Sequence, residues 1–268
     1  MKTGTRRPGA SACDTFVVAT MQVLHGTQRT DVIAPLTQRQ LEGELMDDPL
    51  LNARAHARAL HGLRRINRIS RTAATVWRPI AAIARAHPGR TLTVLDIATG
   101  GGDLPIALSQ RAQRQGVALD VQGCDISGDA VSYARAAAVR ADVPVKFFRA
   151  DALGDGLPTR YDIVTASLFL HHLTDEQVAT LLRKLADHAD HLVISDLIRS
   201  RTGYALAWLG TRLLSRSTIV HVDGLRSVRA AFTVAEAREL ASQAGLDDAH
   251  FARRWPSRFL MTWHRADD

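Results

Sequence analysis

The sequence predicts an α/β protein with a doubly wound, seven-stranded and mostly parallel sheet, an antiparallel C-terminal hairpin and a helical lid. The first observation is an alternation, from residue 91 onward, of short apolar runs with segments at helical spacing. Strands that alternate with helices form a parallel sheet covered on both faces. The second observation is a pair of strand-like runs, 250–255 and 259–264, separated by Pro256-Ser257. Two strands joined so closely must be antiparallel.

The parallel strands are expected where mostly apolar runs have the length of a strand buried on both faces. These runs are residues 91–97, 118–124, 143–149, 161–166 and 191–197. Helices are expected at 104–115, 128–140, 174–188 and 233–245. The last helix has the clearest start signal, because Thr233 and Glu236 have the spacing of a capping box.

Three segments make up the predicted organisation of the chain. Residues 1–45 are interpreted as an N-terminal extension without a fixed structure, residues 46–89 as a helical lid and residues 90–268 as the main domain. Apolar residues at helical spacing predict a helix over 52–86, which Pro79 is expected to divide or kink.

An insertion at 198–232 interrupts the alternation of strands and helices in the main domain. It contains an apolar helical run, 204–214, followed by a segment rich in turn formers, 221–224. We expect this insertion to complete the lid over the carboxyl ends of the strands.

Composition limits the class of protein and its surroundings. The chain has 268 residues, a formal net charge of +7 and two cysteines, Cys13 and Cys124. Two cysteines cannot form a disulfide framework, a cysteine-rich zinc site or a radical enzyme's iron–sulfur cluster, and we expect a reduced, cytoplasmic enzyme. No apolar run reaches the roughly 18 residues that span a bilayer. The basic residues are almost all arginine and are spread along the chain, so we expect no nucleic-acid partner.

The most informative motif runs from Asp96 to Asp103, after the first expected strand, and contains Ala98, Thr99, Gly100 and Gly102. Glycines at this position let the backbone turn sharply and approach a ligand that binds beyond the strand ends. A dinucleotide fingerprint would need a third glycine where Pro105 stands. The flanking acids also disfavour a pyrophosphate and favour a cationic ligand.

Two further acids follow the next expected strands. Asp125 ends the second strand and Asp151 follows the third. A carboxylate in either place can accept hydrogen bonds from hydroxyl or amino groups. Three acids at three successive strand ends, together with the glycine loop, are hard to attribute to chance.

At these residues the sequence resembles the class I S-adenosylmethionine-dependent methyltransferases, which share a Rossmann-like fold. The resemblance covers roughly residues 90–265 and makes 90–268 a catalytic domain that binds S-adenosylmethionine. It implies that Asp125 accepts the ribose hydroxyls beside Ile126 and that Asp151 accepts the adenine amino group. Ser167 and Leu168 would line the methionine end. The implied cofactor-binding residues are Asp96, Ala98, Thr99, Gly100, Gly102, Asp125, Ile126, Asp151, Ala152, Ser167 and Leu168.

The segment after the fourth strand resembles the corresponding segment of phenol and polyketide O-methyltransferases, whose catalytic histidine falls at His171. Because a phenol has a pKa of about 10, a base that removes its proton assists transfer. A second interpretation remains open, in which His171 only packs or hydrogen-bonds near the cofactor. Ser167 stands where magnesium-dependent catechol enzymes have an acid, so we expect no metal.

The sequence also resembles a bacterial methyltransferase subgroup associated with type III polyketide synthases, through Met46–Pro49, Leu63–Asn67, His221–Gly224 and Ser227–Phe232. This resemblance implies a small aromatic or polyketide acceptor, and we expect His172, His221 and Arg226 to contact it. Exposed apolar residues in the lid are compatible with a homodimer.

Four functions therefore stay open. The leading hypothesis is an O-methyltransferase acting on a small phenolic or polyketide-type acceptor. The alternatives are a C-methyltransferase of a quinone or aromatic ring, an RNA methyltransferase, and a cofactor-binding protein without catalysis.

Overall fold

A computed structural model describes residues 36–47, 51–154, 157 and 159–266. Their strands form one seven-stranded sheet in the order β3-β2-β1-β4-β5-β7-β6. The strands are β1 (Leu92–Ile97), β2 (Leu119–Asp125), β3 (Lys146–Arg149), β4 (Tyr161–Ser167), β5 (Ala189–Leu197), β6 (His250–Arg254) and β7 (Arg258–His264). β1 to β5 run parallel, while β7 is antiparallel to both β5 and β6. The predicted fold and C-terminal hairpin are confirmed.

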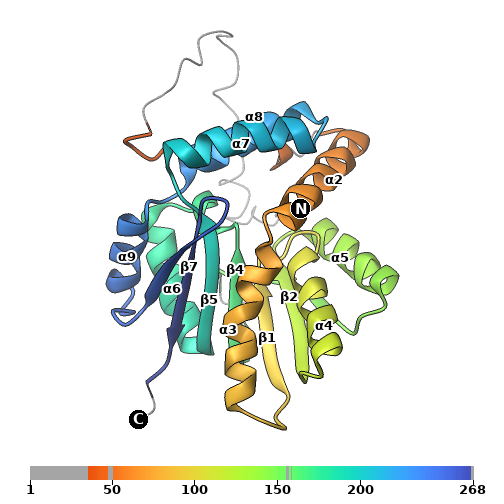
Figure 1. Cartoon of the computed structure of the whole chain (residues 1–268), viewed down its shortest axis with the longest axis vertical. Coiled ribbons are helices and arrows are strands. Elements are labelled where there is room, and N and C mark those ends of the chain that lie inside the picture. Colours follow the sequence, from red (N-terminus) through yellow and green to blue (C-terminus); the bar gives the residue numbers. More distant parts are fainter. Residues whose placement is uncertain (1–35, 48–50, 155–156, 158, 267–268) are drawn as a thin grey trace, which may run out of the picture. The chain divides into compact units, whose positions relative to one another are not determined.

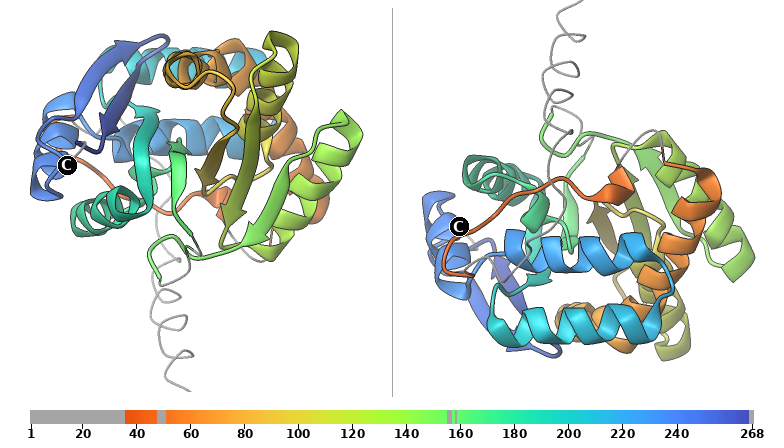
Figure 2. Two further views of the ribbon diagram at one scale, coloured as in Figure 1. Left: turned by 90° about the horizontal axis from the view of Figure 1, so that it is seen from below. Right: turned by 90° about the horizontal axis from the view of Figure 1, so that it is seen from above.

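Helices cover both faces of the sheet, as seen from below in Figure 2. Along β1 the side chains alternate, so that Val94 packs in one apolar cluster and Leu95 and Ile97 pack in the other. The first cluster includes α3 (Thr72–Ala86) and α4 (Asp103–Gln115), and the second includes α6 (Asp175–His188) and α9 (Val234–Gln243). α5 (Gly128–Ala141) packs on β3 through a third cluster. Both faces are therefore closed to ligands, which leaves the strand ends.

Three helices of the predicted lid segments, α2 (Ala53–Ile69), α7 (Arg201–Leu214) and α8 (Thr218–Ala230), lie across one end of the sheet in Figure 1, whereas α3, also predicted in the lid, packs on a face of the sheet. The expected long helix over 52–86 is in fact two helices, and the break falls at Ser70-Arg71 rather than at Pro79, which lies inside α3. Arg71 adopts a left-handed conformation there. The buried guanidinium of Arg258 donates to Thr72 immediately after the break, which fixes this junction to the sheet.

The expectation of turns at 221–224 was wrong, because these residues lie within α8. Gly224 is used for packing: a Cβ atom there would lie 2.6 Å from Thr211 Cγ2 of α7. The absence of a side chain at Gly224 lets α7 and α8 lie side by side, as the view from above in Figure 2 shows. None of the helices among the described residues combines the length and apolarity needed to cross a bilayer.

Of the predicted extension 1–45, residues 1–35 lie outside the described residues. The following stretch, residues 36–47, which we call the strap, runs along α8 and ends in the short helix η1 (Leu45–Asp47). Gln40 donates its backbone N–H to Arg229 at 3.1 Å, and Asp223 accepts from the N–H groups of Leu45 and Met46 at 2.8 and 3.0 Å. The strap is thus attached to α8 at Gln40 and again at Leu45 and Met46.

Candidate functional site

In the loop between β1 and α4, every second residue from Ala98 to Gly102 has a left-handed backbone conformation. Ala98, Gly100 and Gly102 have φ angles of 50°, 53° and 78°. Gly102 has a second requirement for glycine, because a Cβ atom would lie 2.8 Å from the Phe147 ring. At Ala98 the conformation costs an L-residue on the order of 1–2 kcal/mol. The loop therefore holds a strained shape that exposes its backbone at the strand ends.

Asp125 ties this loop to the end of β2. Its Oδ2 accepts the N–H of Gly100 at 2.8 Å and its Oδ1 accepts the N–H of Ser127 at 2.9 Å. Its carbonyl accepts from Ala150, which brings the end of β3 alongside. Asp151 follows there, exposed, with Oδ1 accepting from Leu153 at 2.9 Å. The two predicted acids thus lie at neighbouring strand ends, with Ile126 exposed beside Asp125 and Ala152 buried beside Asp151.

Asp96 lies underneath the loop. It is 2% exposed and accepts a hydrogen bond from Thr165 Oγ1 at 2.7 Å. Burial raises the pKa of Asp96 to about 7. Thr99, also buried, is anchored by its N–H to the Cys124 carbonyl at 2.9 Å. These two predicted residues support the loop from below.

Ser167 and Leu168 end β4. The Ser167 hydroxyl is buried and makes no hydrogen bond to any described residue, whereas Leu168 has a left-handed φ of 58°. A buried polar atom without a partner is uncommon in a folded protein and is satisfied when a ligand supplies the partner. The orphaned hydroxyl, the open space beside Gly100 and the acids beyond β2 and β3 fit a nucleoside with a polar tail.

His171 lies in the short helix η2 (Leu170–His172), which follows β4. Its side chain is 5% exposed, and its Nδ1 is 2.7 Å from Oδ1 of Asp196, near the end of β5. Burial lowers the pKa of His171, but the carboxylates of Asp196 and Glu44 raise it by more than burial lowers it. The pKa of His171 is therefore above its ordinary value. Although burial acts the other way, His171 lowers the pKa of Asp196. The two form a buried dyad with Nε2 directed away from Asp196.

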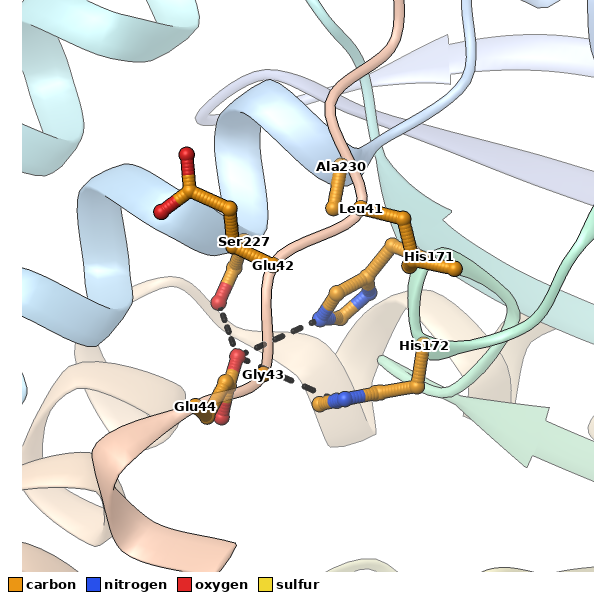
Figure 3. A pocket seen from close by; sticks show the side chains of 8 residues that line it. All are labelled: Leu41, Glu42, Gly43, Glu44, His171, His172, Ser227 and Ala230. Atoms are coloured by element: carbon orange, nitrogen blue, oxygen red, sulfur yellow. Dashed lines mark hydrogen bonds and ion pairs between the residues drawn. The ribbon is translucent and has the colours of Figure 1, made fainter. Parts of the chain in front are cut away.

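A small pocket opens at Nε2, as Figure 3 shows. It has a volume of about 150 Å³. The strap, η2 and α8 supply its walls, which are Leu41, Glu42, Gly43, Glu44, His171, His172, Ser227 and Ala230. Glu44 Oε1 lies 3.9 Å from Nε2 of both His171 and His172 and accepts from the Ser227 hydroxyl.

Arg39 holds the strap against η2. It donates to the backbone carbonyls of Ala230 at 2.6 Å and of His171 at 3.1 Å, and pairs with Asp175 at 2.9 Å. Its guanidinium lies 3.9 Å from the centre of the Phe232 ring. The position of Glu44 therefore depends on the contacts of Arg39 as well as on the hydrogen bond that its own side chain accepts from Ser227.

The predicted acceptor contacts divide into two groups. His172 lines the pocket, and burial followed by the neighbouring His171 lowers its pKa to about 4. His221 does not line this pocket: its Nε2 lies 2.9 Å from the Ser215 carbonyl. Arg226 pairs with Glu42 at 3.2 Å and donates to the Gly43 carbonyl, so it supports the strap.

Sequence reasoning missed Asp196, Glu44 and Ser227. Asp196 could have been suspected, since it is an acid near the carboxyl end of a strand that is otherwise buried. Glu44 carries no local signal, because only the tertiary fold brings the strap to η2.

The sheet order and the left-handed glycine loop after β1, with acids after β2 and β3, are features of a Rossmann-like α/β domain with the methyltransferase fold. Residues 94–190 match the family model described as a methyltransferase domain. The matched segment, which spans β1 to the start of β5, is therefore a methyltransferase domain by its sequence.

Curated relatives match the same region. The chain is 29% identical over 124 residues to the ubiquinone biosynthesis O-methyltransferase of Photorhabdus laumondii, covering 45% of this chain and 49% of the relative. It is 30% identical over 125 residues to the protein of that name from Methylococcus capsulatus, covering 46% and 50%. The chain spans about half the length of the curated relatives it matches.

Solved structures share the fold. Magnesium protoporphyrin IX methyltransferase from Synechocystis PCC 6803, with bound S-adenosylhomocysteine, superposes with a TM-score of 0.53 at 22% identity, covering 77% of this chain and 94% of that one. The plantazolicin methyltransferase BpumL superposes with a TM-score of 0.56 at 14% identity, covering 80% and 88%. At these identities the likeness establishes the fold alone.

Proposed function

We propose that the protein is an S-adenosylmethionine-dependent O-methyltransferase that acts on a small phenolic or polyketide-type acceptor. The observation that carries this proposal is the buried His171–Asp196 dyad, whose Nε2 opens on a pocket beside the ends of β4 and β5. The names of the curated relatives support methyl transfer to oxygen. The polyketide-type acceptor rests on the sequence resemblance.

The cofactor, when bound, supplies a methyl group that is already activated on a sulfonium sulfur. We assign its ribose hydroxyls to Asp125 and its adenine amino group to Asp151, because these acids lie at neighbouring strand ends. The Ser167 hydroxyl supplies a hydrogen bond at the methionine end. The backbone of the glycine loop lies between these groups, where it allows close approach.

His171 would accept the proton of the acceptor hydroxyl at Nε2. A phenolic hydroxyl transfers its proton poorly to water at neutral pH. A positioned base typically raises the rate of such a reaction by 10²- to 10⁴-fold. Asp196 orients the imidazole through Nδ1 and stabilises the imidazolium that forms. Because the dyad is buried, water competes weakly for the same proton.

The pocket supports an acceptor of limited size. A cavity of about 150 Å³ holds roughly one aromatic ring. Leu41 and Ala230 provide apolar contacts, while His172 and Glu44 provide polar ones. A larger acceptor would have to extend past the strap.

The test is to incubate the purified full chain with S-adenosylmethionine and a panel of phenols, catechols and hydroxypyrones. We expect S-adenosylhomocysteine and a methoxy product, identified by mass spectrometry and NMR. His171→Ala should lower kcat by at least about 10²-fold while the Kd for S-adenosylmethionine changes little. A ring-bound methyl group would favour the C-methyltransferase, and methylation of RNA alone would reject the proposal.

A further inference from the structure

Three side chains of metal-ligand type converge at the pocket. His171, His172 and Glu44 each offer a ligand atom within 4.8 Å of those of the other two, and Glu44 Oε1 is 3.9 Å from Nε2 of each histidine. The three side chains are 5%, 33% and 13% exposed. We propose that this cluster binds a divalent transition-metal ion of the zinc class. The proposal goes beyond the methyltransferase activity and does not depend on it.

The donor set suits such an ion. Two imidazoles and one carboxylate are ligands for zinc and its first-row neighbours, whereas magnesium and calcium prefer oxygen donors alone. An ion midway between the three atoms would lie roughly 2.5 Å from each, compared with about 2.0–2.2 Å in zinc sites. A contraction of a few tenths of an ångström at each side chain would complete the coordination.

Outer hydrogen bonds already orient two of the three ligands. Asp196 contacts Nδ1 of His171 at 2.7 Å, which leaves Nε2 as the free coordinating atom. The Ser227 hydroxyl donates to Glu44. A carboxylate behind a ligating histidine is the common arrangement in zinc proteins, where it fixes the ring and raises its basicity. The same contact from Asp196 that would orient His171 as a general base would therefore also orient it as a metal ligand.

The backbone also holds the ligands in place. His171 and His172 are adjacent in η2, with ring centres 4.2 Å apart. Arg39 and Asp223 fix the strap on either side of Glu44. The pocket beyond the three atoms leaves room for a fourth ligand, such as water or an acceptor oxygen.

Metal and proton exclude each other at this site. A metal ligand must be deprotonated, and an Nε2 that coordinates an ion has no lone pair for a proton. Metal binding should therefore switch off the proposed base, and added Zn²⁺ should inhibit methyl transfer.

Binding is tested on the full chain without cofactor or acceptor. After removal of metal with a chelator, Co²⁺ is added and visible absorption is recorded, and Zn²⁺ is then titrated against a chromophoric chelator. We expect one ion per chain, and visible Co²⁺ bands that Zn²⁺ abolishes. Absence of saturable binding at 100-fold molar excess of Zn²⁺ would overturn the proposal.

Variants identify the ligands. Glu44→Gln and His172→Asn should each raise the Kd for Zn²⁺ at least tenfold, while His250→Asn, an exposed histidine on β6, should leave it unchanged. Circular dichroism and thermal melting establish that each variant folds. Equal affinity in all three variants would show that the ion binds elsewhere and would reject the site. Because the readout is binding, a protein that fails to transfer methyl groups still tests this proposal.

Discussion

Asp196 holds both the backbone and the side chain of His171. Its Oδ2 accepts the His171 backbone N–H at 3.1 Å, and its Oδ1 lies 2.7 Å from Nδ1. One carboxylate near the end of β5 therefore sets the position of η2 and the direction of Nε2 together. Such orientation before substrate binds is what a proton acceptor requires.

Asp196→Asn should leave the fold in place and reduce turnover. The amide can still accept one hydrogen bond, but it no longer stabilises an imidazolium, and we expect kcat to fall by about 10²- to 10⁴-fold. Steady-state kinetics with an acceptor that the wild type methylates provides the measurement. Asp190→Asn, near the other end of β5, is the matched control. Similar kinetics in the two variants would contradict the role of the dyad.

Asp125→Ala should weaken the binding of S-adenosylmethionine. The change removes the proposed ribose contact and also releases the N–H groups of Gly100 and Ser127. Charged hydrogen bonds contribute about 1.5–3 kcal/mol each, so the Kd measured by calorimetry should rise at least tenfold. Asp129→Ala, at the exposed start of α5, controls for the loss of one acid. An unchanged Kd would exclude the ribose assignment.

Asp96 should make the apoprotein less stable as the pH rises. Burial raises the pKa of Asp96 to about 7 in the folded state, whereas the exposed carboxyl group of an unfolded chain has a pKa of about 3.8. Between these values the folded chain retains a proton that the unfolded chain has lost, so the free energy of unfolding falls as pH rises from about 4 to 7. The loss is up to about 4 kcal/mol.

Urea denaturation at pH 5 and pH 8 measures this effect. In Asp96→Asn, the free energy of unfolding should differ less between pH 5 and pH 8 than in wild type. Asp129→Asn should retain the wild-type difference. If Asp96→Asn shows the same pH dependence as wild type, the carboxyl group titrates normally and the prediction fails.

Arg39→Ala should release the strap. The variant loses the hydrogen bonds to His171 and Ala230 and the contact with Phe232, and we expect a loss of about 2–3 kcal/mol in stability. Limited proteolysis should cleave within 36–47 faster than in wild type, with sites read by mass spectrometry. Arg114→Ala, on the exposed side of α4, should be cleaved at the wild-type rate. Equal protection in both variants would show that other contacts fix the strap.

The fold could be predicted because its signals are local. Each parallel strand overlaps one of the short, mostly apolar runs from which it was predicted, and the capping box at Thr233 is present as expected. Two local signals misled: Pro79 is accommodated inside α3, and Gly224 permits close helix packing instead of a turn. In both cases tertiary contacts outweighed the ordinary preference of the residue.

The candidate site could be predicted only in part, because its pairs are distant in sequence. His171 was predicted, but its partner Asp196 lies 25 residues further along the chain, and Glu44 lies on the strap. The acids at the ends of β2 and β3 were predicted because topology alone brings neighbouring strand ends together. No sequence periodicity places the strap over η2.

Because the strap is attached to α8, most of the residues that line the pocket lie on other elements than the residues of the dyad. The dyad joins η2, which carries His171, to β5, which carries Asp196, whereas α8 and the strap carry Leu41, Ser227 and Ala230, which line the pocket. If the proposed function holds, substitutions on α8 should change which acceptors fit the pocket while the His171–Asp196 dyad stays intact. The proposed enzyme could then acquire a new acceptor through changes in α8 and the strap alone, because neither of them contributes a residue to the dyad.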